Sequence, residues 1–330
     1  MKRLSLWIML CLTLSVSAGD VLTNEIHKSH LDNGLQVVTV PFDSPGIVSF
    51  FVLVRVGSRE EVEHGVTGFA HFFEHVMFRG TERFPKDKYS QMLQKLAAAG
   101  NANTWLDRTL YYFTGNADDM ETMFDIESDR FRYLKYSEHG FKTEAGAVLG
   151  EYTKNFASPF RQIFSAMSET AFDKHTYKHS TMGFIEDIKN MPNQYEYSKK
   201  FYDRFYRPEY CTVMVVGDTN HDQVMKLSKK FFGGWEKGNY KAQIPVEPQQ
   251  KGERRKHLQF DGNTNMMLLQ YKGPAFSDVK KDKAAVDLLL NIAFSEKSAI
   301  HKKLVQEQPK AAFIEADPTD TRDPYLLRVL

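Results

Sequence analysis

The stretch of sequence that decides both fold and function reads Gly68-Phe-Ala-His-Phe-Phe-Glu-His-Val-Met-Phe78. Apolar residues recur at helical spacing from Val66 to Phe78, which predicts a helix. Spacings of three and four place His71, Glu74 and His75 on one face of that helix. Two imidazoles one turn apart can both bind a single zinc ion, and a carboxylate between them can take a proton from its water. The order of these residues is the inverse of the commoner zinc helix.

A catalytic zinc ion needs a third protein ligand and an open position for water. A second predicted helix, Lys142 to Asn155, supplies two carboxylates, Glu144 and Glu151, seven residues apart and therefore on one face. One of them can bind the metal, while the other can accept a hydrogen bond from a metal-binding histidine and orient its ring. The alternative is that both glutamates belong to a solvated helix face. The histidine motif alone arises by chance in about a few per cent of chains of this length.

The surrounding chain predicts an α+β fold with a mixed, largely antiparallel sheet and helices packed on one face. Runs rich in β-branched and aromatic residues predict strands, and apolar residues at helical spacing predict further helices. The predicted strands are Leu35–Val40, Ile47–Val56, Asn103–Thr114 and Cys211–Val216, and the further helices are Lys88–Ala99, Asp118–Lys135 and Tyr195–Tyr206.

The strand, loop and helix pattern of the first part begins again after a polar, proline-containing linker at 236–256. Aligning Val52–Phe78 with Leu268–Phe294, a shift of 216, matches Gly57 to Gly273 across a strand, a loop and a helix. We therefore expect a first, zinc-binding domain at 19–235 and the start of a second, incomplete copy at 257–330. The positions of His71, Glu74 and His75 fall in that copy on Asp287, Leu290 and Asn291, so the second copy is expected to be noncatalytic.

The first eighteen residues have the pattern of a secretory signal peptide. Lys2 and Arg3 precede the apolar run Leu4–Val16, and small residues follow at 16–18. A membrane anchor is the alternative, but the run is shorter than the roughly 20 residues that span a bilayer. We expect a secreted protein, periplasmic in a bacterium, with no integral membrane span after cleavage. Cleavage leaves Cys211 as the only cysteine, so no disulfide can form within the mature chain.

Overall charge excludes one class of partner. The 330 residues carry 43 Lys and Arg against 42 Asp and Glu, a formal net charge of +1. Electrostatic capture of nucleic acid needs a basic excess that this composition lacks. We therefore expect no nucleic-acid partner.

Several of these motifs together resemble the pitrilysin or insulinase family of zinc metallopeptidases, the inverzincins, and within it the mitochondrial processing peptidase group with its bacterial relatives. The inverted motif with its following Gly80-Thr81 matches, and Glu151 lies 80 residues after His71, as in the family. Further similar stretches are Asn101-Ala-Asn-Thr104 with Thr109 and Tyr111, Glu144, Tyr206-Arg-Pro208, Val215-Val-Gly-Asp218 and Ser298–Glu307.

The resemblance implies a zinc endopeptidase that hydrolyses peptides or unfolded protein segments. It implies one Zn²⁺ per chain on His71, His75 and Glu151, with Glu74 as general base and Glu144 behind a histidine. Asn101 and Ala102 would bind the peptide as an added strand, although from its residue type Asn101 could be a simple turn residue.

The chain departs from the family pattern in two ways. Alternative assemblies and functions also stay open. Gly150 stands where many relatives carry glutamate, and the family's Arg and Tyr substrate-gripping pair, which belongs to the second domain, has no assignable match. The chain could form a homodimer or pair with a related subunit. It could instead be a noncatalytic or partner-dependent subunit of a paired complex, or a binding module without metal.

Overall fold

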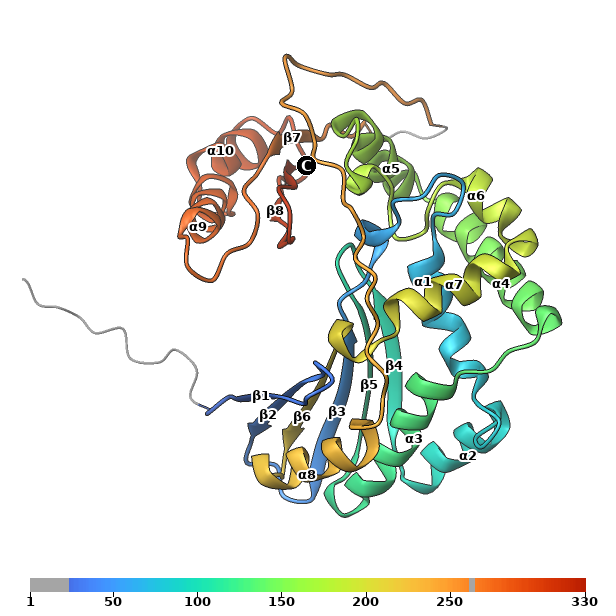
Figure 1. Ribbon diagram of the computed structural model, residues 1–330. Helices are drawn as coiled ribbons and strands as arrows, with labels where there is room; N and C mark the ends of the chain where they lie inside the picture. The colour runs from blue at the N-terminus through green and yellow to red at the C-terminus, as the bar shows by residue number, and fades with distance from the viewer. Residues whose placement is uncertain (1–23, 261–264) are drawn as a thin grey trace, which may run out of the picture.

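A six-stranded sheet forms the centre of the N-terminal part of the chain (Figure 1). The computed structural model describes residues 24–260 and 265–330; the predicted signal peptide lies outside them. The strands follow the order β1-β2-β6-β3-β5-β4, and only the β2–β6 pair is parallel. Their bounds are β1 (His27–His30), β2 (Gln36–Pro41), β3 (Ile47–Val54), β4 (Ala99–Thr104), β5 (Thr109–Asn116) and β6 (Cys211–Gly217).

Strand β3 shows why helices cover one face of this sheet. Val48, Phe50, Val52 and Val54 are fully or almost fully buried, whereas the residues between them are more accessible. Side chains alternate between the two faces of a strand, so the buried set defines the core face. The structure therefore confirms the predicted α+β class with a largely antiparallel sheet.

Eight helices accompany the first sheet in the described part of the chain. They are α1 (Phe69–Val76), α2 (Lys86–Lys95), α3 (Met120–Tyr133), α4 (Glu138–Phe156), α5 (Pro159–Ala171), α6 (Ile185–Asn190), α7 (Tyr195–Phe205) and α8 (His221–Phe232). Helix α1 begins after Gly68, whose φ of 90° lies in the left-handed region that favours glycine. It therefore starts three residues later than predicted.

One strand prediction is wrong. Asn103–Thr114 is not a single strand, because the chain reverses at 105–108, where the Trp105 N–H donates to the Arg108 carbonyl over 2.7 Å. The Asp107 side chain in this turn accepts a hydrogen bond from the Tyr177 hydroxyl over 2.6 Å. Strands β4 and β5 are the two arms of the resulting hairpin, and β4 ends the strand order.

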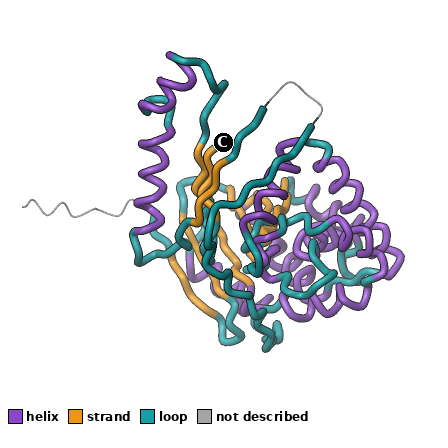
Figure 2. Tube along the Cα trace, turned by 90° about the horizontal axis from the view of Figure 1, so that it is seen from above, coloured by secondary structure: helices purple, strands orange, loops and turns teal. Residues whose placement is uncertain are grey.

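A smaller second unit, residues 265–330, follows the predicted linker. Within the described residues, 236–256 contains no helix or strand. The second unit has a three-stranded sheet in the order β7-β9-β8, and Figure 2 shows its helical part standing apart from the helices of the first unit. Its elements are β7 (Leu269–Lys272), α9 (Asp282–Phe294), α10 (Ala299–His301), a π-helical turn (Lys302–Glu307), β8 (Ala316–Pro318) and β9 (Leu326–Val329).

The strand-then-helix order of the second unit is the one that the repeat predicted, since α9 covers 285–292, the positions 216 residues after α1. The domain limits themselves stay a prediction. None of the helices described has the length and apolar character needed to cross a membrane.

Candidate metal centre

Helix α1 carries two histidines whose rings pack edge to face. The Nε2 atoms of His71 and His75 lie 3.3 Å apart, with the rings at 81°. His71 is buried and His75 is half-buried. The apolar side chains of α1, among them Phe72 and Phe73, are completely buried. Core packing on these sides fixes the helix, so the imidazoles have little freedom to move apart.

Helix α4 brings the third donor from 76 residues further along the chain. The Glu151 Oε2 atom lies 3.2 Å from the His75 Nε2 and 3.6 Å from the His71 Nε2. The two helices are held together by aromatic packing, with the rings of Phe72 and Phe141 5.0 Å apart. In the described part of the chain, His71, His75 and Glu151 form the one group of three such side chains able to hold a metal ion.

The spacing of the three donor atoms fits a zinc ion. A tetrahedral ion with ligand distances of about 2.0–2.1 Å requires its ligand atoms to lie about 3.3–3.4 Å apart. The three separations between the Nε2 and Oε2 atoms are 3.2, 3.3 and 3.6 Å. Two imidazoles and one carboxylate are also the donor types that zinc takes in catalytic sites. Whether these residues bind metal stays a prediction.

Glu74 lies beside this group without belonging to it. Its Oε2 atom is 4.0 Å from the His71 Nε2. Burial raises the pKa of the Glu74 carboxyl above its ordinary value. A carboxylate with a raised pKa accepts and releases protons more readily near neutral pH, which is the property of a general base.

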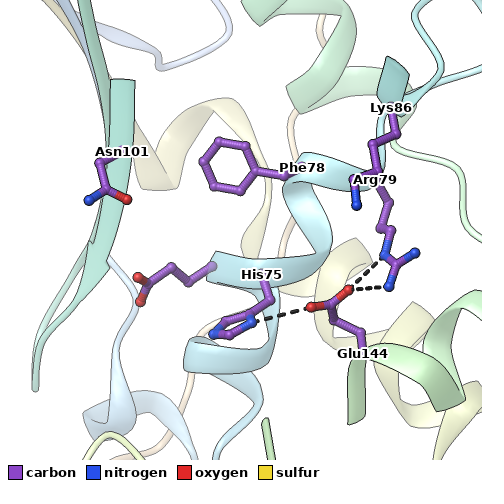
Figure 3. Close-up of a pocket in the computed structure, with 7 residues that line it drawn as sticks. His75, Phe78, Arg79, Lys86, Asn101 and Glu144 are labelled. Carbon is purple, nitrogen blue, oxygen red and sulfur yellow. Dashed lines mark hydrogen bonds and ion pairs between the residues drawn. The ribbon is translucent and has the colours of Figure 1, made fainter. Parts of the chain in front are cut away.

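Glu144 links His75 to an arginine (Figure 3). Its Oε1 atom lies 3.3 Å from the His75 Nδ1, and its Oε2 atom accepts a hydrogen bond from the Arg79 Nε over 2.6 Å. The hydrogen bond from His75, followed by that from Arg79, lowers the pKa of the Glu144 carboxyl. Glu144 is therefore a charged acceptor that orients the His75 ring with its Nε2 toward His71 and Glu151.

A cavity of about 250 Å³ opens between this centre and strand β4 (Figure 3). Its lining joins the proposed catalytic carboxylate to the edge of the sheet: Glu74, His75, Phe78, Arg79, Lys86, Asn101 and Glu144. Asn101 is exposed, whereas the neighbouring Ala102 is buried. Both lie within β4, paired with Tyr112 and Tyr111 of β5, so the alternative that Asn101 is only a turn residue is wrong.

Glu61 supports the centre and was not predicted from any motif. It is buried, and its carboxylate accepts hydrogen bonds from the Gly68 N–H (2.8 Å) and the Ala70 N–H (2.7 Å) at the start of α1. Burial raises the pKa of the Glu61 carboxyl to about 8. The first N–H groups of a helix have no partner within it, so this side chain fixes the beginning of the histidine helix.

Two models of one protein family match the chain. The model described as insulinase (peptidase family M16) matches residues 37–184, and the model described as the peptidase M16 inactive domain matches residues 194–329. Together with the fold and the side chains gathered on α1 and α4, these matches show that the chain belongs to the insulinase (M16) peptidase family. The family resemblance predicted from the sequence is thus confirmed; the narrower processing-peptidase group stays a prediction.

Named relatives agree with this assignment. Zinc protease PqqE of Helicobacter pylori is 32% identical over 290 residues, which cover 86% of this chain and 64% of that protein. The crystal structure of a protease from Helicobacter pylori is 29% identical, has a TM-score of 0.83, and is matched over 93% of this chain and 74% of its own. The chain thus spans slightly less than two thirds of the curated relative PqqE.

A more distant match extends the likeness in fold. The crystal structure of the periplasmic protease PqqL from Escherichia coli has a TM-score of 0.73, with 93% of this chain and 36% of that chain covered. Its identity of 21% is low, so the match shows the fold alone.

Proposed function

We propose that the chain is a zinc endopeptidase in which His71, His75 and Glu151 hold one Zn²⁺ and Glu74 is the general base. The observation that carries this proposal is the convergence of three donor atoms from α1 and α4 at zinc-like separations, with a second carboxylate, that of Glu74, 4.0 Å from His71. Zinc protease homologues in the M16 family support the same chemistry.

Each side chain has a separate task in this proposal. A zinc ion on the three ligands would supply a Lewis acid and a bound water of lowered pKa. Glu74 takes a proton on its carboxylate and later returns it to the leaving amine. Glu144, held by Arg79, keeps the His75 Nδ1–H in a fixed hydrogen bond, so that the opposite nitrogen faces the metal.

Strand β4 is the proposed binding edge for the substrate. It is the last strand in the order, so one of its edges has no partner strand among the described residues. An extended peptide can add to such an edge by backbone hydrogen bonds. Asn101 and Ala102 lie there, and Asn101 lines the cavity that also contains Glu74. We therefore infer that peptides and unfolded segments are the substrates, because a folded protein rarely offers a free strand.

We also propose where the protein acts and with what it could pair. The predicted signal peptide supports secretion, and we propose a bacterial periplasm as the destination. Homologues include subunit 1 of the bovine cytochrome b-c1 complex, which supports assembly with a paired family subunit. A homodimer is the other assembly that we propose. The same homologue and the match to an inactive domain support a second candidate, a noncatalytic or partner-dependent subunit.

Glu74→Gln tests the proposal directly. Removing a general base lowers the rate by about 10²–10⁴-fold while the three ligands remain, so hydrolysis of an unstructured peptide should collapse and zinc content should persist. His71→Ala should lose both. Glu82→Gln, an exposed carboxylate after the motif, is the matched control and should change neither.

The outcomes separate the two candidates. Unchanged hydrolysis in Glu74→Gln contradicts the assigned base. A wild-type chain that retains zinc but hydrolyses peptide only after a family partner is added supports the partner-dependent subunit. A chain without zinc after dialysis contradicts both candidates and supports a binding module.

A further inference from the structure

A second and larger cavity lies where the linker passes between the two units. It measures about 500 Å³, within the range of about 300–1,000 Å³ typical of small-ligand sites. We call it the linker cavity. Its lining comes from three separate parts of the chain: Arg59, Phe172 and His175 of the first unit, the linker residues 244–250, and Lys272, Asp323 and Pro324 of the second unit. It shares no lining residue with the cavity beside His75.

Most of the linker cavity wall is apolar. Three prolines and three apolar side chains contribute to it: Phe172, Ile244, Pro245, Val246, Pro248 and Pro324. Val246 is 88% exposed, whereas Phe172 is buried in a small aromatic cluster with Tyr177 and Tyr325. A solvent-facing apolar wall of this kind favours an apolar ligand body, because binding removes both surfaces from water.

Three residues of the cavity wall, Arg59, His175 and Asp323, are already paired with one another. The Asp323 Oδ2 atom accepts a hydrogen bond from the Arg59 Nε (2.6 Å) and lies 2.9 Å from the His175 Nε2. Arg59 also contacts Glu60 at 2.8 Å. Arg59 and His175 therefore have a carboxylate partner within the protein.

Glu247 is also satisfied. Its carboxylate accepts hydrogen bonds from the backbone N–H groups of Asp173 (2.8 Å), Lys174 (2.9 Å) and His175 (2.9 Å). These bonds tie the linker to the end of α5 and leave this carboxylate committed to the backbone.

Lys272 is the charged lining residue left over. Among the described residues its ammonium group makes no direct hydrogen bond or ion pair, although the nearby carboxylates of Glu247 and Asp173 attract it. Its side chain is exposed, and the ammonium group lies 3.2 Å from the centre of the Phe172 ring. Burial lowers the pKa of the Lys272 amine to about 8. A partly desolvated ammonium over an aromatic ring gains strongly from an anionic partner.

We propose that the linker cavity binds an apolar carboxylate, with the carboxylate paired to Lys272 and the apolar body against Phe172, Val246 and the prolines. The chemistry suits the C-terminal residue of a peptide with an apolar side chain, and it also suits a fatty acid. The site is independent of the proposed zinc centre, because none of its residues contributes to that centre.

Calorimetric titration of the full chain with three probes tests the site. N-acetyl-leucine carries the free carboxylate, N-acetyl-leucinamide lacks it, and dodecanoate represents the fatty acid. We expect N-acetyl-leucine to bind about tenfold or more tightly than its amide. Lys272→Met keeps the length of the side chain and should lower the affinity for the acid by about tenfold or more, without changing binding of the amide.

Two further variants make the result decisive. Lys280→Met, an exposed lysine outside the wall, is the matched control and should bind as the wild type does. Val246→Asp places a negative charge on the wall at an exposed position and should weaken acid binding even if Lys272→Met unfolds the second unit. The Lys272 dependence also separates this site from a carboxylate bound to zinc.

The probe that binds better identifies the source of the ligand. A dodecanoate affinity that exceeds that of N-acetyl-leucine and depends on Lys272 assigns the site to fatty acids, and the reverse order assigns it to peptide C-termini. Equal binding of acid and amide, or acid binding that is unchanged in both Lys272→Met and Val246→Asp, overturns the proposal.

Discussion

Helices α1 and α9 correspond to each other in the 216-residue repeat predicted from the sequence, but only α1 is enclosed. Six of the residues of α1 are buried, including His71, whereas α9 buries only Lys283 and Leu290. Leu288, Leu289 and Ile292 of α9 each expose more than 60% of their surface. A strand followed by a helix therefore occurs in both units, with the helix packed in the first and largely exposed among the described residues of the second.

The residues at equivalent positions differ in the partners that they find. Asp287, at the place of His71, forms an ion pair with Lys283 one turn away, and Asn291, at the place of His75, donates to the Asp287 carbonyl over 2.9 Å. These groups are satisfied within their own helix. On α1 the donors face a second helix, α4, which brings a carboxylate from outside. A metal centre thus needs both the donors and a partner helix that is fixed against them.

The largest effect is expected from giving α1 the residues of α9. The double variant His71→Asp, His75→Asn removes both imidazoles from the three-donor group, and zinc should fall from about one equivalent to nearly none, since catalytic zinc needs three protein ligands. Peptide hydrolysis should fall with it. Elemental analysis after dialysis measures the first effect.

The reverse exchange is the control. Asp287→His with Asn291→His puts two imidazoles on α9 without a facing carboxylate, so the chain should still hold about one zinc at low metal concentration. A second tightly bound zinc in that variant would show that the donors alone suffice and would contradict the comparison.

The next largest difference between α1 and α9 is expected in the free energy of unfolding, because α1 is packed and α9 is exposed. Phe73 of α1 is completely buried and its ring stacks on Phe201 with centroids 5.3 Å apart, so Phe73→Ala should cost about 3–5 kcal/mol of unfolding free energy. Leu289→Ala on the exposed face of α9 should stay within about 0.5 kcal/mol. Chemical denaturation followed by circular dichroism compares them. Equal losses would mean that the α9 face is covered in solution.

This contrast shows how far the sequence could predict the molecule. Helical periodicity is local, so the common face of His71, Glu74 and His75 followed directly from their spacing. The approach of Glu151 depended on the packing of α4, which only the family resemblance implied. The hairpin turn at 105–108 was missed because the residues on both sides of it favour strands.

Features built from distant or irregular segments were beyond the sequence. Glu61 accepts hydrogen bonds at the start of α1 from the preceding loop, which ends at Gly68 with a positive φ. The linker cavity depends on the path of 244–250, a stretch with no periodic pattern. Neither arrangement leaves a signal in residue order.

A third and smaller test compares the N-termini of α1 and α9. Glu61→Gln replaces one of two acceptor oxygens and leaves a buried N–H of α1 without a partner, at a cost of about 1–3 kcal/mol. Lys281, at the start of α9, makes no side-chain cap, so Lys281→Ala should change stability little. The comparison is weakened if both substitutions cost the same.

The pH dependence of stability adds a second measurement to this test. Burial raises the pKa of Glu61 to about 8, so between about pH 4.5 and 8 the folded state holds a proton that the unfolded chain releases. Stability contributed by that proton falls as the pH rises through this window. Glu61→Gln cannot titrate and should lose that part of the slope, which denaturation at pH 5 and pH 8.5 would show.

The smallest expected effect concerns α4, the helix that packs against α1 and has no counterpart beside α9 in the described residues. Gly150 precedes Glu151 on α4, and a methyl group added there would meet no atom within 4 Å. Its backbone is helical, so Gly150→Ala should stabilise the fold by about 0.4–1 kcal/mol by restricting the unfolded chain. Zinc content and hydrolysis should not change, because α4 contacts α1 through Phe141, Glu144 and Glu151 and not through Gly150. Lost zinc in this variant, with stability raised, would mean that freedom of α4 at Gly150 is itself needed to bring Glu151 to the histidines.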